Sequence, residues 1–262
     1  MKKLAIIPIL FFCFTSCVSR VVDWHHITIP SFVYDYRELN EEVGWQFDHN
    51  ELRLEYVTPW ESRKVVATLG LIKEKYATPE SREAHRKLSN KHNDCSYNHT
   101  YTYYHHINTF VDYDRPTAYS EDFVEIRISS NSDYDQDHLK GSSLADITTF
   151  VGYSYKEFID SGYTFVNEWL YGTPLYHCKE IHKMVNELTI ADLTLLASHT
   201  FSNIKVPSYP QNKFDFALTF NIAPTLSQQH TLEIVFVSDE GKEFRFEVDV
   251  DFAPTAAEIK EK

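Results

Sequence analysis

Four oxygen-bearing side chains at alternate positions form the densest group of hard metal ligands in the chain. Asn131, Asp133, Asp135 and Asp137 have the spacing that opens a calcium-binding loop. The sixth and twelfth positions lack the glycine and glutamate of an EF-hand, so that motif is excluded. The sequence predicts a looser calcium site at Asp133, Asp135 and Asp137. The alternative is a solvated turn in which these carboxylates accept hydrogen bonds from their own backbone.

Transition-metal ligand types gather at His177, Cys178, Glu180 and His182. Residues five apart do not share one face of a helix, and no ligand pair with a recognised zinc spacing lies elsewhere. The sequence therefore disfavours zinc. It also contains neither a nucleophile elbow nor the two-histidine metalloprotease motif. With 38 acidic residues, a carboxylate pair for glycoside hydrolysis is the one catalytic arrangement that stays open.

The amino terminus carries a different kind of chemistry. Lys2 and Lys3 precede an apolar run over residues 4–14, which is the layout of a secretory signal peptide. That run is shorter than the roughly 20 apolar residues of a membrane-spanning helix. The block Phe14-Thr15-Ser16-Cys17 then resembles the lipobox of bacterial lipoproteins, in which small residues precede an acylated cysteine.

The resemblance implies that residues 1–16 are removed and that Cys17 becomes the lipid-bearing first residue, which anchors the protein to a membrane. No acidic residue follows Cys17 closely, which favours the periplasmic side of the outer membrane over the cell surface. The alternative is an ordinary signal peptide, after which Cys17 is lost or stays a plain thiol.

Export would leave two further cysteines, Cys95 and Cys178, in a compartment that permits disulfides. We weigh a Cys95–Cys178 bridge equally against two separate buried thiols, because a free cysteine packs like a small apolar residue.

Composition excludes several classes of partner. The formal net charge is −13 and no basic run is present, so the chain lacks the electrostatic footprint of a nucleic-acid-binding protein. With only seven glycines and no glycine-patterned phosphate loop, nucleotide binding is also disfavoured. Aromatic residues make up 15%, which is typical of proteins rich in half-buried strands.

Periodicity divides the mature chain into unequal parts. We expect residues 17–33 to form a tether that leads into a first strand, and residues 34–94 to form a helix-containing segment around a strand at 51–56. Helices are predicted at residues 37–43, 58–76 and 79–91; the last two begin with a Thr-Pro capping pair. Further capping signals predict short helices after Ser154 and at residues 193–197.

The second half of the chain alternates polar and apolar residues. Strands are predicted at residues 97–103, 123–129, 164–171, 214–222, 231–237 and 243–252. Asp239-Glu240-Gly241 supplies the turn between the last two strands. Residues 253–262 look like a disordered tail.

This pattern of short antiparallel strands is typical of a β-sandwich. Residues 95–252 look like the immunoglobulin-like domains of many uncharacterised bacterial lipoproteins. The predicted class is therefore mainly β with α (α+β), with short helices in the amino-terminal part.

Two functions follow from these observations. The first is a non-catalytic envelope lipoprotein that binds a protein or glycan partner, with calcium as the only cofactor considered. The second is a tethered glycan hydrolase that uses a carboxylate pair. A fimbria-like assembly subunit is a lesser third.

Overall fold

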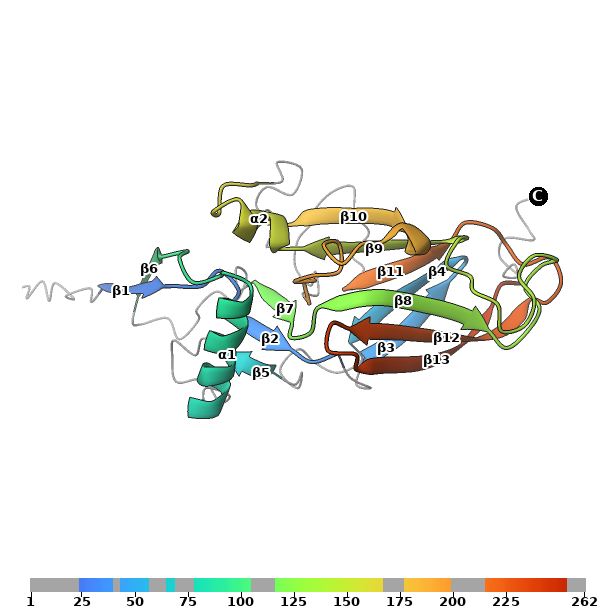
Figure 1. Ribbon diagram of the computed structural model, residues 1–262, viewed down its shortest axis with the longest axis horizontal. Helices are drawn as coiled ribbons and strands as arrows, with labels where there is room; N and C mark the ends of the chain where they lie inside the picture. Colours follow the sequence, from blue (N-terminus) through green and yellow to red (C-terminus); the bar gives the residue numbers. More distant parts are fainter. Residues whose placement is uncertain are drawn as a thin grey trace, which may run out of the picture.

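The computed structural model describes residues 24–39, 43–56, 65–68, 78–104, 116–166, 177–198 and 215–253. These residues are mainly β, as predicted, with two short α-helices. Figure 1 shows two layers of strands, with a two-stranded arm projecting from one end. We call the end that carries the arm proximal and the opposite end distal.

The larger layer is an antiparallel five-stranded sheet in the order β10-β9-β11-β4-β3. Its strands are β3 (Val43–Asp48), β4 (Glu51–Tyr56), β9 (Thr148–Ser154), β10 (Lys179–Met184) and β11 (Phe216–Phe220). The predicted strand at 51–56 is therefore confirmed. Because β3 and β4 join this sheet, the sheet crosses the boundary that we predicted at residue 95.

The smaller layer is a three-stranded antiparallel sheet in the order β13-β12-β8. It contains β8 (Phe123–Ser130), β12 (Gln229–Ser238) and β13 (Glu243–Asp251), which confirms the three clearest strand predictions. Gly241 has a φ of +80° in the turn between β12 and β13, a conformation that glycine adopts without strain.

The two sheets pack face to face through aromatic rings. The ring of Phe216 on β11 lies 6.0 Å from that of Trp45 on β3 and 5.1 Å from that of Phe236 on β12. Trp45 in turn contacts Phe246 on β13 at 5.8 Å. Burying an aromatic or aliphatic side chain of this size contributes about 1.5–3 kcal/mol, so these contacts stabilise the packing of the two layers.

A second, smaller core lies beside the two layers at the proximal end. Here β2 (Asp35–Arg37) pairs with β5 (Val65–Thr68) in an antiparallel and with β7 (Thr117–Tyr119) in a parallel arrangement. Helix α1 (Pro79–Lys91) packs nearby through Ala84 and Leu88. Its start was predicted correctly: Thr78 caps it by accepting a hydrogen bond from the Ser81 N–H at 3.1 Å.

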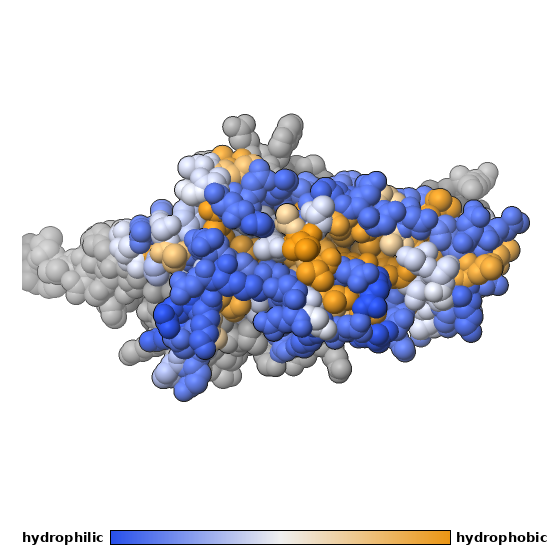
Figure 2. All heavy atoms as spheres, in the orientation of Figure 1, coloured by the Kyte–Doolittle hydropathy of each residue, from blue (hydrophilic) through white to orange (hydrophobic). Residues whose placement is uncertain are grey.

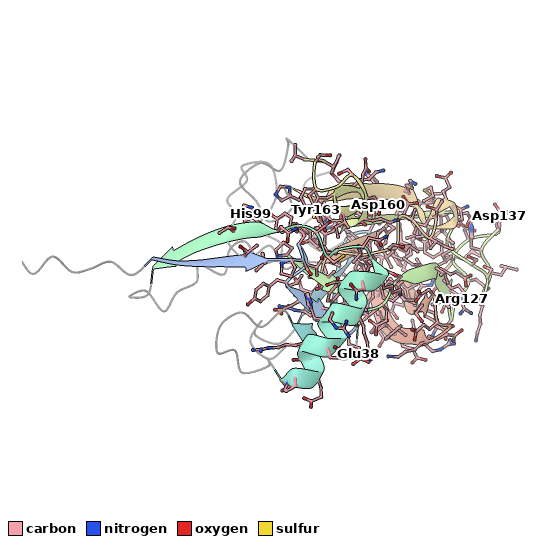
Figure 3. The ribbon with its side chains drawn as sticks, turned by 60° about the vertical axis from the view of Figure 1, so that its left-hand side comes forward. Glu38, His99, Arg127, Asp137, Asp160 and Tyr163 are labelled. Atoms are coloured by element: carbon pink, nitrogen blue, oxygen red, sulfur yellow. The ribbon has the colours of Figure 1, made fainter. Side chains whose placement is uncertain are left out.

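The arm pairs two segments that are far apart in the sequence. Strands β1 (Trp24–Ile29) and β6 (His99–Tyr104) run antiparallel, and Trp24 lies opposite Tyr104 at the far end. Figure 3 shows the arm extending away from the rest of the molecule. The first described residue, Trp24, thus lies at the tip, and β1 lies within residues 17–33, the segment that we predicted as a tether leading into a strand.

Several local predictions were wrong. No helix forms at the described residues of the segment 37–43, which contain the end of β2, an irregular connection and the start of β3. The segment 58–76 was also predicted as a helix, but its described residues form strand β5. Residues 193–197 form bends and isolated bridges instead of a helix, and residues 164–166 are irregular instead of strand. The elements that form at these positions are short, so contacts with distant strands outweigh the local preferences.

The carboxylate of Asp94 ties the proximal region together just after α1. Its Oδ1 accepts hydrogen bonds from the Phe32 N–H at 2.7 Å and the Tyr163 hydroxyl at 3.1 Å, and its Oδ2 accepts from the Val33 N–H at 2.8 Å. The side chain is fully buried. Burial raises the pKa of Asp94, and these three hydrogen bonds offset only part of that rise.

Replacing this carboxylate should destabilise the fold. Asp94→Ala leaves three donors without their acceptor, so the free energy of unfolding should fall by at least about 2 kcal/mol near neutral pH. The pKa of Asp94 is higher in the folded than in the unfolded chain. The free energy of unfolding of the wild type therefore increases as the pH falls from the folded-state pKa toward the unfolded-state pKa of this group, and that of the alanine variant does not. Urea titrations at several pH values should show that the difference in free energy of unfolding between the wild type and Asp94→Ala increases as the pH falls.

The exposed Asp137 provides the control, since Asp137→Ala should change stability by no more than about 0.5 kcal/mol. A gap between the wild type and Asp94→Ala that narrows toward acid would contradict the proposed environment of this carboxyl group.

Candidate functional site

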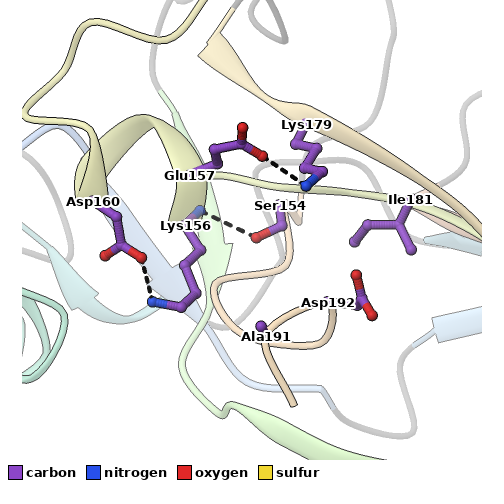
Figure 4. Close-up of a pocket in the computed structure, with 8 residues that line it drawn as sticks. All are labelled: Ser154, Lys156, Glu157, Asp160, Lys179, Ile181, Ala191 and Asp192. Atoms are coloured by element: carbon purple, nitrogen blue, oxygen red, sulfur yellow. Dashed lines mark hydrogen bonds and ion pairs between the residues drawn. The ribbon is translucent and has the colours of Figure 1, made fainter. Parts of the chain in front are cut away.

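A polar groove lies where helix α2 (Lys156–Asp160) meets β10 and the turn at Ala191 and Asp192 (Figure 4). Its volume is about 220 Å³. The residues that line it are Ser154, Lys156, Glu157, Asp160, Lys179, Ile181, Ala191 and Asp192. We call it the α2 groove. Ile181 is buried, whereas most of the other side chains bring charges to the walls.

Ion pairs hold the charged walls in place. Lys156 Nζ lies 2.5 Å from Asp160 Oδ2 within α2, and Lys179 Nζ lies 2.8 Å from Glu157 Oε2 between β10 and α2. The hydrogen bond to Glu157 raises the pKa of Lys179, which therefore stays protonated at neutral pH. These pairs leave the groove with ammonium donors and carboxylate acceptors side by side.

The cap predicted to precede residues 193–197 forms between Thr189 and Asp192, although no helix follows it. Asp192 Oδ2 accepts hydrogen bonds from the N–H and the hydroxyl of Thr189 at 2.9 and 2.7 Å, and Lys183 Nζ donates to both carboxylate oxygens at 2.8 Å. Burial alone would raise the pKa of Asp192, but these hydrogen bonds outweigh it and lower the pKa. Asp192 is therefore a fixed, ionised acceptor at the edge of the groove.

The chemistry of the α2 groove suits binding by hydrogen bonds. Its acceptors are Glu157, Asp160 and Asp192, and each already receives a hydrogen bond or ion pair from a lysine. A general acid at neutral pH needs a carboxyl group with a raised pKa. Burial raises the pKa of Asp94 and of Glu121, which lie outside the α2 groove, whereas the pKa of Asp192 in the groove is lowered.

A second hollow, of about 420 Å³, lies near the start of β12 and the end of β13. Its lining residues are Asn131, Ser132, Gln229, His230, Thr231, Asp249, Val250 and Asp251. The buried His230 ring forms hydrogen bonds with Ser130 Oγ at 2.7 Å and with the Ser227 carbonyl oxygen at 2.9 Å. Since that carbonyl only accepts, Nε2 carries the proton in this network.

The predicted calcium ligands do not converge. Asp133 Oδ1 accepts from the Lys140 N–H at 2.8 Å, and Asp135 Oδ1 accepts from the N–H groups of Asp137 and His138 at 2.9 and 2.7 Å. Asn131 Oδ1 bonds the Thr231 N–H instead. Among the residues that the structure describes, no three His, Cys, Asp or Glu side chains are placed to hold one metal ion. These hydrogen bonds are the ones that the alternative, a turn whose carboxylates accept from their own backbone, predicts.

The transition-metal ligand types around β10 are also dispersed. His177 stacks on Phe158 with ring centroids 4.3 Å apart, and Cys178 is fully buried. Glu180 and His182 are exposed on β10. Glu180 and His182 share the exposed face of β10, whereas the Cys178 side chain lies in the second core and the His177 ring packs on Phe158, so the four do not form one ligand set.

Cys95 and Cys178 are separate thiols, so the bridge considered above is not formed. Cys95 is exposed beyond α1, whereas Cys178 is enclosed by the second core. Burial raises the pKa of the Cys178 thiol well above its usual value, which makes it a poor nucleophile.

Cys17, the predicted site of lipid attachment, lies outside the described residues. In the described portion of the chain, no helix has the length and apolar character needed to cross a membrane.

The two thiols should react very differently. Without reductant, an alkylating reagent should modify Cys95 in the native protein and Cys178 only after denaturation, because the folded chain excludes the reagent from the second core. Mass spectrometry of the cysteine-containing peptides measures both sites separately. A disulfide-linked pair of peptides containing Cys95 and Cys178 would contradict the structure.

The sequence pattern identifies two lining residues of the α2 groove, and only as helix caps. Ser154 and Asp192 gave capping signals, but Lys179 and Glu157 become neighbours only through the tertiary fold. No family model, curated protein or solved structure matches this chain, so the geometry of the described residues carries the functional argument.

Proposed function

We propose that this protein is a lipid-anchored, non-catalytic binding module of the bacterial cell envelope. Residues 1–16 act as the signal peptide and Cys17 carries the lipid, most consistently on the periplasmic side of the outer membrane. The two packed antiparallel sheets support an immunoglobulin-like sandwich as the binding scaffold. The partner is a glycan or a protein.

The observation that carries the anchoring proposal is the position of the arm. Trp24 follows Cys17 by only seven residues and lies at the tip of β1 and β6, away from both sheets (Figure 1). A six-residue strand spans about 20 Å. The arm can thus act as a spacer between a membrane-bound Cys17 and the binding surfaces.

The α2 groove supports the binding part of the proposal. Its size and its mixture of fixed donors and acceptors suit a sugar unit, whose hydroxyl groups both donate and accept hydrogen bonds. Lys179 offers the most accessible ammonium group, since more than half of its side-chain surface is exposed.

Lipid attachment should depend on one residue. Cells grown with an acyl-chain probe should label the wild-type protein, whereas Cys17→Ala should lose the label because the acylated thiol is absent. Fluorescence of the immunoprecipitated protein measures the labelling. Cys95→Ala is the matched control and should keep full labelling; a Cys17→Ala protein labelled as strongly as the wild type would refute the anchor.

Glycan binding should depend on Lys179. Losing one charged hydrogen bond should weaken the affinity of Lys179→Ala for a bound envelope glycan by about tenfold or more. Lys87→Ala, an exposed lysine on α1, should leave affinity unchanged. Binding to an array of envelope glycans, followed by titration of each positive glycan, measures the effect.

Equal losses of glycan affinity in Lys179→Ala and Lys87→Ala would exclude the α2 groove as the glycan site. New reducing ends in the same incubations would instead favour the hydrolase alternative.

A further inference from the structure

Three large aliphatic side chains are exposed on the loops at the distal end. Leu139 is 54% exposed, Ile222 is 50% exposed and Leu226 is 54% exposed. The strand predicted at residues 214–222 includes Ile222, but β11 ends at Phe220 and leaves this side chain exposed. We call these three residues the distal patch. Figure 2 shows hydrophobic surface among hydrophilic residues at this end.

The distal patch rests on an ordered framework built around Tyr134. The Tyr134 hydroxyl donates to the Ile222 carbonyl oxygen at 2.5 Å, and the Tyr134 carbonyl oxygen accepts from the Leu226 N–H at 3.2 Å. Its own N–H donates to the His138 carbonyl oxygen at 2.9 Å, next to Leu139. One buried residue thus fixes both loops that present the patch. Preorganised apolar groups of this kind lose little entropy on binding a partner.

Acidic residues surround the patch on the same loops. Residues 131–146 contain four aspartates and only one lysine, Lys140. Asp137 is exposed at the distal end, as Figure 3 shows, and the side chain of Asp146 is 56% exposed. The adjoining hollow adds Asp249 and Asp251. A ligand that covers the leucines must therefore approach a negatively charged surface.

We propose that the distal patch binds a cationic amphipathic segment of a partner protein. Leucine-type side chains of the segment would cover Leu139, Ile222 and Leu226, and its lysines or arginines would face the surrounding aspartates. A second copy of this chain fits less well because the same acidic loops would meet and repel. An anionic membrane surface is disfavoured for the same reason.

This inference deepens the proposed binding function and rests on it, but it involves a different surface from the α2 groove. The two proposals, glycan binding at the α2 groove and peptide binding at the distal patch, can therefore be refuted independently. Lys179→Ala changes the groove and leaves the distal patch intact, whereas substitutions at the patch leave the groove intact. The lipid anchor takes no part in either binding surface.

The test uses the mature protein purified from cell envelopes in nanodiscs of zwitterionic lipid, with empty nanodiscs as the blank. The probe is a fluorescent amphipathic peptide made of leucine and lysine, compared with a peptide in which glutamate replaces every lysine. Fluorescence anisotropy should show binding of the lysine peptide, no binding of the glutamate peptide, and weaker binding at high salt.

Substitutions then locate the binding surface. Leu226→Ser should weaken the lysine peptide about fivefold, and Ile222→Ser combined with Leu226→Ser should weaken it roughly twentyfold. Ile190→Ser is the matched control because Ile190 is 58% exposed outside the distal loops, and its affinity should equal that of the wild type. Unchanged thermal unfolding of each variant confirms that the fold is intact.

Three results would overturn the proposal. The first is equal binding of the lysine and glutamate peptides. The second is an equal loss of affinity in Ile190→Ser and Leu226→Ser. The third is the absence of lysine-peptide binding at low salt by the folded wild-type protein.

Discussion

Strand β11 is the element on which the two-layer body depends. It lies at the centre of the five-stranded sheet, where it pairs with β9 on one side and β4 on the other. Within its layer it is the only link between the β3–β4 hairpin and the β9–β10 pair, among the strands that the structure describes. Its first residue, Phe216, also contacts the opposite sheet through Phe236. The five residues of β11 (Phe216–Phe220) therefore determine both the order of strands in the sheet and its contact with the opposite layer.

Sequence patterns predicted best where the physical signal is local and long. β8, β12 and β13 alternate buried and exposed residues over many positions, and the side-chain period of a strand is two. β2 and β5 contain only three and four residues, so no period is measurable, and their pairing joins distant segments. Thr-Pro capping signals predicted α1 correctly, but a cap specifies only a first turn and not the chain beyond it.

The candidate sites show the same division. Asp133, Asp135 and Asp137 have a spacing that calcium loops share with ordinary turns, and only the positions of their hydrogen-bond donors distinguish the two. The α2 groove needs Glu157 from a helix and Lys179 from an edge strand, a meeting that sequence spacing does not encode. The distal patch could not be predicted from the sequence for a related reason. Ile222 continues the polar–apolar alternation of β11, but the pairing of β11 with β9 stops at Phe220.

The arm has a consequence for the order of folding. Thr28 on β1 meets Thr100 on β6 across a separation of 72 residues in the chain. Closing so long a loop is entropically unfavourable until the intervening segment has compacted, so β1 gains its partner late. A chain fixed to a membrane by its amino terminus would thus assemble its main body while still loosely connected. Pairing of β1 with β6 would then convert that connection into a stiff spacer as the last step of maturation.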